Sequence, residues 1–447
     1  MGAITDEAGL TGALATQSAS VRYGDLSLDA RALARQCILD YLGCTLAGAQ
    51  ERLTLLVLAE MEEQGGGGAA TVVGHAARLP ALSAAMVNGS AAHALDFDDV
   101  NMAMPGHPSV AILPGLLALA EERGASGAAV LTAFVAGYEL QCRLGRAIAP
   151  GHYDGLGFHA TATVGSFGAA AACAHLLGLD PATTATALGI AGTQAAGLKS
   201  MFGTMCKPLH AGKASFHGLL AARLAARGFS SRDDVIECAQ GFARTHSADF
   251  SPERALAAPP RGLWIFDNLF KYHAACYLTH APIEAARKLG VTPADVRRIR
   301  LRVDQATDRV CNIAEPRTGL EAKFSLRLTT AMALAGLDTG ALETYSDGIA
   351  TDPALVAMRD RVTIEFASGW PHTLAEIEAE TASGKRLSAR HDAGVPAEDI
   401  REQGRRVEEK FHSLARPLLR EAAARVLETV RHFGELEDVR TLLALCR

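Results

Sequence analysis

The sequence lacks several patterns that would place it in a common class of protein. None of its nine cysteines is spaced as Cys-x-x-Cys and their number is odd, which argues against a disulfide framework, a zinc site and an iron–sulfur cluster. Lysine and arginine total 43 against 49 aspartates and glutamates, and a net charge of −6 argues against a nucleic-acid-binding protein. The absence of paired cysteines favours a reducing, cytoplasmic location.

No segment indicates export, a membrane span or phosphate binding. Met1 to Val21 has no basic stretch followed by an apolar core, so no signal peptide is predicted. No run of about 18 apolar residues is free of charges and helix breakers, so no membrane partner is expected. Gly65–Gly68 is not followed by Lys-Ser or Lys-Thr, which indicates a flexible loop and not a phosphate-binding one.

Helical periodicity dominates about the first 265 residues. Apolar residues at helical spacing predict a helix over Ala128–Ala149 and another over Ala211–Arg227. Thr161–Leu177 consists almost entirely of small and apolar residues, which predicts a buried central helix. Asp180 followed by Pro181 predicts a capped helix start.

The period changes after Pro293. Apolar residues alternate with arginines from Arg298 to Val303, which predicts a half-buried strand, and Thr381–Lys385 reads as the turn of a hairpin. Gly319–Leu337 and Ile400–Thr429 are predicted as helices. The predicted fold class is therefore mostly α with an inserted α+β domain. Residues 1–267 and 396–447 would form a large all-helical domain built from both termini, and residues 268–395 a smaller α+β lid domain.

Charged side chains gather in an apolar region between His93 and His107. Asp96, Asp98 and Asp99 lie between these two histidines, and charges are rarely kept in such surroundings unless they are paired or functional. Mixed aspartate and histidine ligands would suit manganese or iron, whereas the alternative is a network of caps and buried hydrogen bonds. We favour a third interpretation, in which His107 faces a substrate, Asp96 orients it and no metal is bound.

Two further segments carry groups that can transfer protons. Gly151–His159 is rich in glycine and is predicted as a loop, from which Tyr153 and His159 could reach a cleft. Lys207 precedes a proline on a predicted turn that opens a helix, where the helix dipole and desolvation favour a neutral amine that acts as a base. Cys206 beside it is expected to be a packed thiol.

The later segments supply cations. Lys271 lies in Lys-Tyr-His-Ala-Ala-Cys at the expected domain boundary, where clefts form. Arg317 lies in a predicted loop before a helix, where a guanidinium can clamp a carboxylate or form an interdomain salt bridge.

These motifs, in this order, resemble the MmgE/PrpD family, which includes 2-methylcitrate dehydratase, cis-aconitate decarboxylase and iminodisuccinate epimerase. The resemblance covers roughly residues 25 to 420 and rests on sequence runs that are weak singly and specific together: HALDFDD, GHPS, FHATATVGSFGAA, KPLHAGKASFHG, KYHAAC, EAKFSL and Glu409-Lys410-Phe411. It implies a homodimer and an active site between domains without an obligatory cofactor.

The resemblance also implies site residues. The decarboxylase branch has functional residues at the positions of Asp96, His107, His159, Lys207 and Lys271, and this sequence keeps all five residue types. Two positions depart from that branch: Val100 stands in place of a threonine and Leu328 in place of a tyrosine.

Motif spacing is closest to the iminodisuccinate epimerase branch. The eleven-residue step from Asp96 to His107 is similar to that branch, in which a tyrosine matching Tyr153 and a lysine matching Lys207 form the proposed proton-transfer pair. This sequence has one extra residue between Tyr153 and His159.

We therefore predict an enzyme without a cofactor that removes the proton α to a carboxylate of a small di- or tricarboxylate. The leading mechanism is epimerisation by Tyr153 and Lys207 on opposite faces, and the alternative is a lyase of the dehydratase or decarboxylase type. A non-catalytic carboxylate-binding protein is a remote alternative. The residues predicted to bind the substrate are Lys271, Arg317, His210 and Lys323.

Overall fold

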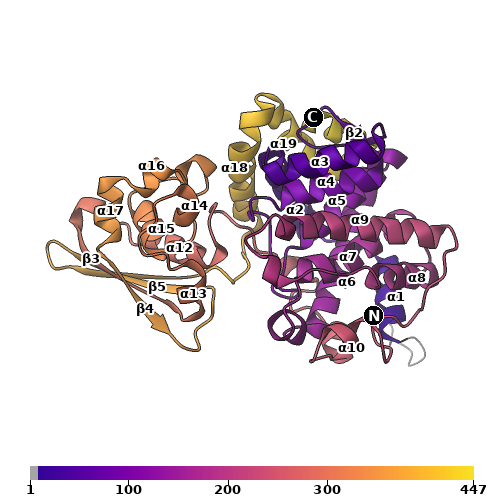
Figure 1. The fold of residues 1–447 in the computed structure, drawn as a ribbon, viewed down its shortest axis with the longest axis horizontal. Helices are drawn as coiled ribbons and strands as arrows, with labels where there is room; N and C mark the ends of the chain where they lie inside the picture. Colours follow the sequence, from indigo (N-terminus) through magenta and orange to yellow (C-terminus); the bar gives the residue numbers. More distant parts are fainter. Residues whose placement is uncertain (1–8) are drawn as a thin grey trace. The chain divides into compact units, whose positions relative to one another are not determined.

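The computed structural model describes residues 9–447, which divide into two compact units. One unit ends at Phe270 and resumes at Glu398, and the other runs from Lys271 to Ala397. The predicted boundaries at 267/268 and 395/396 lie two or three residues from these divisions. The first unit is helical and the second, orange in Figure 1, combines helices with a four-stranded sheet. The predicted fold class is confirmed.

The helical unit is arranged around one buried helix, α7 (Ala160–Leu176). Every residue from Ala160 to Ala174 is buried, as expected for a helix without a polar face. The helices that pack most extensively on α7 are α5 (Pro108–Arg123), α6 (Gly127–Ile148), α8 (Pro181–Gly192) and α9 (Cys206–Ala226). The rest of the unit comprises α1 (Leu10–Ser20), α2 (Leu28–Gly48), α3 (Arg52–Gly65), α4 (Ala81–Ala92), α10 (Phe242–His246), α11 (Pro252–Leu256), α18 (Ile400–Leu419), α19 (Ala422–Arg431), α20 (Arg440–Leu443) and the short pair β1 (Ala70–Thr71) and β2 (Arg78–Leu79).

Local sequence signals set several helix ends. Asp180 caps α8 by accepting a hydrogen bond from the Thr183 N–H at 3.0 Å, as predicted. Gly124 ends α5 with φ of +62°, a left-handed conformation that glycine adopts without strain. α9 begins at Cys206, five residues before the predicted start at Ala211.

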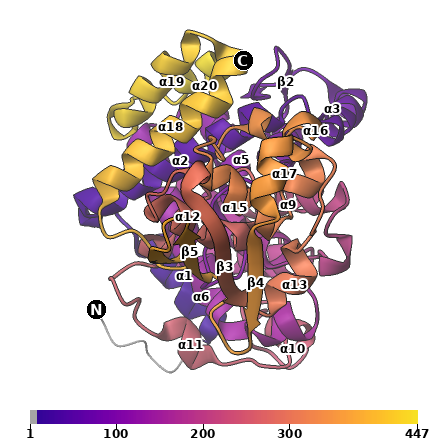
Figure 2. The ribbon, with the colours of Figure 1, turned by 90° about the vertical axis from the view of Figure 1, so that its left-hand side faces the viewer.

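The C-terminal segment returns to the helical unit. α18 packs along α2, so the last part of the chain lies side by side with the first, yellow against indigo in Figures 1 and 2. The single helix predicted over Ile400–Thr429 is wrong, because α18 ends at Leu419 and α19 starts at Ala422. Pro417 has no N–H for the helix, and Arg420 has a positive φ of +52° with ψ of −121°, which takes the backbone out of the helix.

The second unit is built on a sheet in the order β4-β3-β5-β6. β3 pairs in parallel with β4 and antiparallel with β5, so Leu301 lies opposite Ile364 on one side and Ile377 on the other. Alternate residues of β3 are buried, as predicted from the arginine alternation. The strands are β3 (Val296–Asp304), β4 (Val362–Ala367), β5 (Leu374–Thr381) and β6 (Arg386–Asp392).

Helices cover one face of this sheet (Figures 1 and 2). The predicted helix Gly319–Leu337 is wrong, because it is divided into α14 (Gly319–Ala322) and α15 (Leu326–Leu334). The hydroxyl of Ser325 accepts a hydrogen bond from the Leu328 N–H and starts a new helix there. The other helices are α12 (His280–Lys288), α13 (Ala306–Cys311), α16 (Asp347–Ala350) and α17 (Pro353–Arg359).

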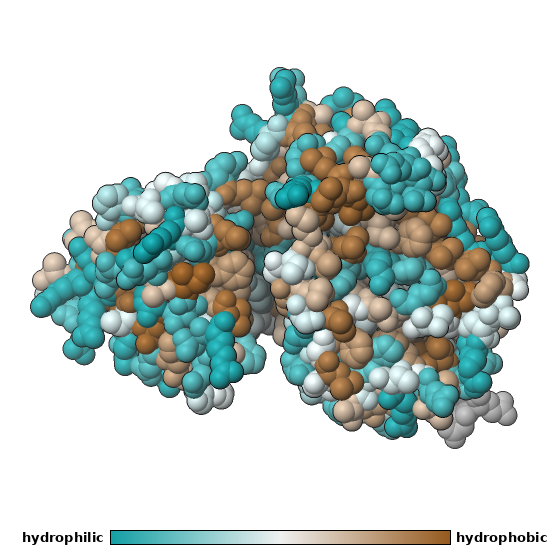
Figure 3. Space-filling view, in the orientation of Figure 1, coloured by the Kyte–Doolittle hydropathy of each residue, from teal (hydrophilic) through white to brown (hydrophobic). Residues whose placement is uncertain are grey.

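The visible face of each unit carries small hydrophobic patches among hydrophilic side chains (Figure 3). On the helical unit, Leu28, Leu55 and Leu56 are among the large apolar residues that remain exposed. Within residues 9–447, no helix is both long and apolar enough to cross a membrane.

We predict that the crossing of α7 and α9 tolerates no side chain at Gly218. A methyl group there would lie 2.3 Å from the Ala169 Cβ and 2.7 Å from the Ala170 backbone nitrogen, so the two helices would have to separate. Gly218→Ala should lower the free energy of unfolding by about 1–3 kcal/mol. Gly24→Ala is the control, since nothing lies within 4 Å of its added Cβ. Equal stabilities of the two variants in denaturant titrations would contradict this prediction.

Candidate active site

The loop from Ala94 to His107 carries the central side chains of the site. It joins α4 to α5, so that His93 follows the last residue of α4 and His107 precedes Pro108, the first residue of α5. Asp96 has φ of +50°, in the left-handed region that costs a side-chain-bearing residue about 1–2 kcal/mol. This strain is concentrated at a residue that faces the site, as is common for functional groups.

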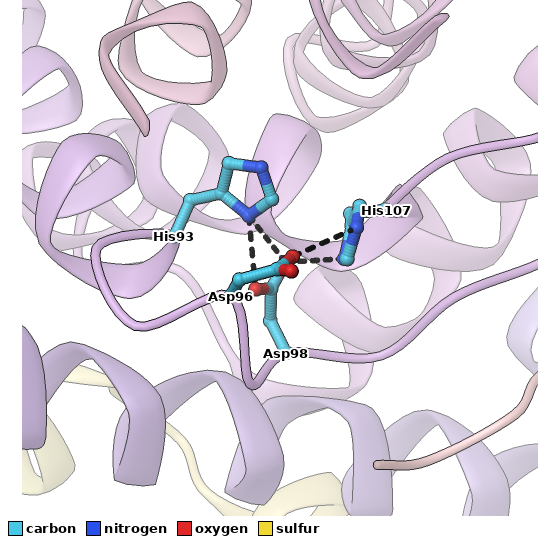
Figure 4. Close-up of side chains that lie close together, drawn as sticks. All are labelled: His93, Asp96, Asp98 and His107. Carbon is cyan, nitrogen blue, oxygen red and sulfur yellow. Dashed lines mark hydrogen bonds and ion pairs between the residues drawn. The ribbon is translucent and has the colours of Figure 1, made fainter. Parts of the chain in front are cut away.

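The carboxylate of Asp98 is held between two imidazoles. It is fully buried and lies 2.9 Å from His93 Nδ1 through one oxygen and 2.9 Å from His107 Nδ1 through the other. Figure 4 shows the two rings approaching this carboxylate from different sides. His93 hydrogen-bonds to Asp98 through Nδ1, and His107 forms an ion-pair contact with it through Nδ1, so the Nε2 atom of each ring lies on the side away from Asp98.

Electrostatics follow from this geometry. Burial alone would raise the pKa of Asp98, but the imidazoles of His107 and His93 outweigh burial and hold it well below its usual range. The pKa of His93 is lowered to about 4, chiefly by burial and also by the charges of Lys207 and His107. Together these effects outweigh the Asp98 carboxylate, which alone would raise the pKa. The cluster therefore keeps Asp98 ionised.

Lys207 meets this cluster from α9. Its ammonium Nζ lies 2.6 Å from Asp96 Oδ1, and the same oxygen lies 3.4 Å from His107 Nε2. Lys207 opens a helix as predicted, but Asp96 does not orient His107 as we expected. Asp98 contacts the His107 ring at Nδ1 and orients it. Asp96 contacts the other ring nitrogen, Nε2, and also the Lys207 ammonium. These contacts depend on the direction in which each aspartate side chain points, and the spacing of the aspartates in the sequence does not determine that direction.

His159 and His210 lie on the other side of His93. The His159 ring stacks on His93 at 5.8 Å between ring centres, and its Nδ1 is 3.1 Å from His210 Nδ1, so one nitrogen donates to the other. Phe202 contacts both His159 and Lys207: its ring centre lies 5.0 Å from the His159 ring centre and 5.3 Å from the Lys207 ammonium. Burial lowers the pKa of His159 well below its usual range, and it is uncharged at neutral pH.

The glycine-rich segment forms a single π-helical turn, Gly151–Gly155. The Lys199 ammonium lies 3.7 Å from the centre of the Tyr153 ring and donates to the Tyr153 carbonyl at 3.1 Å. Burial, with smaller contributions from the charges of Asp154 and Asp96, raises the pKa of Tyr153 to about 12. Tyr153 is thus a neutral phenol near neutral pH.

The remaining candidates belong to two environments. Cys206 was expected to be packed but is exposed, because it is the first residue of α9. Lys271, Arg317 and Lys323 belong to the second unit, where Lys271 is buried, Lys323 is half-buried and Arg317 is exposed just before α14. The structure therefore brings together Asp96, His107, His159, Lys207 and His210 in the helical unit.

The same loop also offers potential metal ligands. One atom each from His93, Asp96, Asp98 and His107 lies within 4.8 Å of the others. The cationic partners of these carboxylates are already supplied by the chain, because Lys207 contacts Asp96 and the imidazoles flank Asp98. This arrangement favours the proton-transfer interpretation over metal binding.

Comparison with known proteins identifies the family. A family model described as the MmgE/PrpD N-terminal domain matches residues 12–255, and one described as the MmgE/PrpD C-terminal domain matches residues 273–434. The chain belongs to the MmgE/PrpD family. The expectation raised by its sequence motifs is confirmed.

Several curated relatives are named cis-aconitate decarboxylase. The Aspergillus terreus protein is 31% identical over 63% of this chain and 60% of its own length. The human protein is 29% identical over 98% of this chain and 94% of its own length, and the mouse protein is 30% identical over 83% and 79%.

The two departures from the decarboxylase branch lie in different environments. Val100 is nearly buried, and its backbone pairs with Leu269 in both directions at 2.8 Å. Leu328 is fully buried in α15 of the second unit. Both positions are apolar and closely packed in this chain.

Three contributors to the site were not singled out from the sequence. His93 and Asp98 were considered only as possible metal ligands, and Phe202 was not assigned a role. Three aspartates within four residues look equivalent in a sequence, and no spacing rule distinguishes the one that faces the imidazoles. The signal that the sequence offered was a group of charged residues between two histidines in an otherwise apolar region.

We predict that the protein needs no metal. After prolonged treatment with a chelator, its melting temperature should be unchanged, and elemental analysis should find far less than one equivalent of metal, because Lys207 already neutralises Asp96. Stoichiometric manganese or iron whose removal lowers the melting temperature would contradict this prediction.

We also predict that His152 makes the fold sensitive to acid. Its ring is buried between the His246 carbonyl and the Thr163 hydroxyl, each at 2.7 Å, and burial lowers its pKa to about 4. The unfolded chain, with a pKa of about 6.5, binds the proton more tightly, so stability falls as the pH drops from about 6.5 towards 4.

The test compares His152→Gln with the wild type in urea titrations at pH 7 and pH 5. The variant should lose about 2 kcal/mol less stability between these pH values than the wild type. Equal losses in the two proteins would show that His152 is not an acid-sensitive group.

Proposed function

We propose that this protein is a lyase that acts on a small di- or tricarboxylate without a cofactor. The observation that carries the proposal is the position of His107, with Nδ1 held by the buried Asp98 carboxylate and Nε2 directed towards Asp96 and the Lys207 ammonium. A carboxylate that fixes one imidazole nitrogen leaves the other free to exchange a proton with a substrate. The lysine beside it can stabilise negative charge that develops on that substrate.

Helix ends support a carboxylate substrate. His107, His159 and Lys207 stand at or next to the N-terminal ends of α5, α7 and α9, which are 16, 17 and 21 residues long. The N-terminus of a helix carries partial positive charge and free N–H groups, and it attracts anions. Three such ends meet around one cluster, so a carboxylate bound there is favoured even though the protein is acidic overall.

The reaction follows from these roles. In a decarboxylation, the bond between a carboxylate and the adjacent carbon breaks, carbon dioxide leaves, and the electron pair remains on carbon as an enolate-like anion. Lys207 stabilises that charge, and protonated His107 delivers a proton to the carbon. In a dehydration, His107 instead removes the proton α to a carboxylate, and the protonated imidazole then gives that proton to the hydroxyl on the neighbouring carbon, which leaves as water. Relatives named cis-aconitate decarboxylase make an unsaturated tricarboxylate the first substrate to test.

The proposal assigns different tasks to the remaining residues. His159 and His210 are assigned hydrogen bonding to the substrate, because burial keeps His159 uncharged. Lys271, Arg317 and Lys323 are assigned the binding of further substrate carboxylates. A homodimer and a cytoplasmic location are parts of the same proposal.

A second candidate is the epimerase that motif spacing favours. Tyr153 lies in the turn Gly151–Gly155, shortly before His159 and the start of α7 in the chain, and a two-base mechanism would pair it with Lys207. A phenol with a pKa of about 12 is a poor base at neutral pH, and this makes the lyase the better supported function.

The deciding experiment follows candidate acids by NMR in deuterium oxide. For a decarboxylation we expect loss of carbon dioxide with deuterium entering the product carbon, and for a dehydration we expect loss of water with formation of a carbon–carbon double bond. His107→Gln and Lys207→Ala should lower kcat by about 10²–10⁴-fold, the usual contribution of acid–base groups. Tyr153→Phe and the exposed control Lys385→Ala should keep turnover within a few-fold of the wild type.

Two results would overturn the lyase. Interconversion of enantiomers that Tyr153→Phe abolishes would establish the epimerase. Binding of acids without any exchange of deuterium would establish a carboxylate-binding protein that is not an enzyme.

A further inference from the structure

A buried lysine of the C-terminal helix lies directly beneath the loop that carries the site. Lys410 comes from α18 and is 7% exposed. Its Nζ donates to Asp40 Oδ1 of α2 at 2.6 Å and to the carbonyl oxygen of Phe97 at 2.6 Å. Its ammonium also lies 4.0 Å from the centre of the Phe97 ring. One cation therefore holds both the backbone and the side chain of Phe97.

Phe97 stands between the two aspartates that form the site. Asp96 precedes it with φ of +50°, and Asp98 follows it, fully buried between His93 and His107. A left-handed residue reverts to an ordinary conformation unless its surroundings hold it. The anchored Phe97 carbonyl fixes the peptide that joins these residues, and the 1% exposed Phe97 ring fixes the loop against the core.

The charges beneath the loop balance only with Lys410 present. Burial alone would lower the pKa of Lys410, but the Asp40 carboxylate outweighs burial and raises it, so the side chain is an ammonium. Burial and the charge of Asp40 raise the pKa of Asp99 to about 8, which leaves Asp99 largely neutral at pH 7 in its 2.5 Å hydrogen bond with the Ser109 hydroxyl. Asp40 and Lys410 then form one neutral pair, and Asp98 is held by its contacts with the His93 and His107 rings.

We propose that Lys410 is a positioning residue, which orients Asp96 and Asp98 towards Lys207 and His107 through Phe97. This inference rests on the proposed function for the role of the site, and it gives a structural role to the lysine of the Glu409-Lys410-Phe411 run. It also makes the C-terminal return of the chain a part of the site. A buried pair that served only stability could be replaced by neutral groups without moving the loop.

The test uses variants that separate charge from packing. Lys410→Met leaves the buried Asp40 carboxylate without its cation and is expected to be unstable. The double variant Asp40→Asn with Lys410→Met removes both charges and is the informative protein. Lys410→Arg keeps the positive charge, and Arg401→Met removes an exposed charge from the same helix as the matched control.

Two readouts are needed. In the double variant, kcat should fall by about 10- to 100-fold, the scale expected for misplaced reacting groups, while KM changes by less than about threefold. Lys410→Arg should recover part of that loss, and Arg401→Met should match the wild type. In proteins labelled with ¹⁵N-histidine, the double variant should shift the imidazole signals of His93 and His107, and Arg401→Met should not.

The inference is overturned if the double variant keeps kcat within twofold and leaves both imidazole signals unchanged. The spectra need no substrate, so they decide the role of Lys410 even if the wild type turns over none of the acids tested. In that case the proposed function fails, and the positioning of the loop is judged on the imidazole signals alone.

Discussion

The buried carboxylate of Asp98 is the interaction on which the site depends. An unpaired carboxylate in this interior would cost several kcal/mol and would take up a proton instead. The rings of His93 and His107 prevent this: His93 Nδ1 contacts both carboxylate oxygens and His107 Nδ1 contacts one of them, so the positions of the three groups depend on one another. Since both Nδ1 atoms are occupied, the Nε2 atom of His107 is directed towards Asp96 and Lys207. The orientation of the proposed acid–base group is thus a consequence of neutralising a buried charge.

The helical scaffold explains why this charge cluster exists in an apolar protein. Helices rich in alanine and glycine approach one another closely, as at Gly218, and they leave little room for polar groups within the core. The beginnings of α5, α7 and α9 contribute His107, His159 and Lys207, where the chain enters each helix from a loop. Close packing also brings α18 against α2, which lets Lys410 reach the loop from the far end of the chain.

The spacing of apolar residues predicted the central helix and the half-buried strand, because an element that buries one face needs apolar residues at its own structural period. The central helix near Thr161–Leu177 and the half-buried strand after Pro293 were both predicted from residue pattern, and both are present. The limit of apolar spacing as a signal is shown by two long helices that were predicted wrongly, Gly319–Leu337 and Ile400–Thr429. In each, the apolar spacing continues across a break in the helix. A cap at Ser325 and the conformation of Arg420 interrupt them locally.

The sequence by itself determined the family, the fold class and most of the residue types at the site, because specific motifs and hydrophobic spacing are local properties of the chain. Tertiary structure alone decided which aspartate serves which partner. Asp98 orients His107 and Asp96 pairs with Lys207, although the sequence presents them as near neighbours of one kind. It also decided that Tyr153 is a half-buried neutral phenol in contact with Lys199 and that Lys410 lies against Phe97. Side-chain direction and burial depend on contacts between residues that are distant in sequence, so no local pattern contains them.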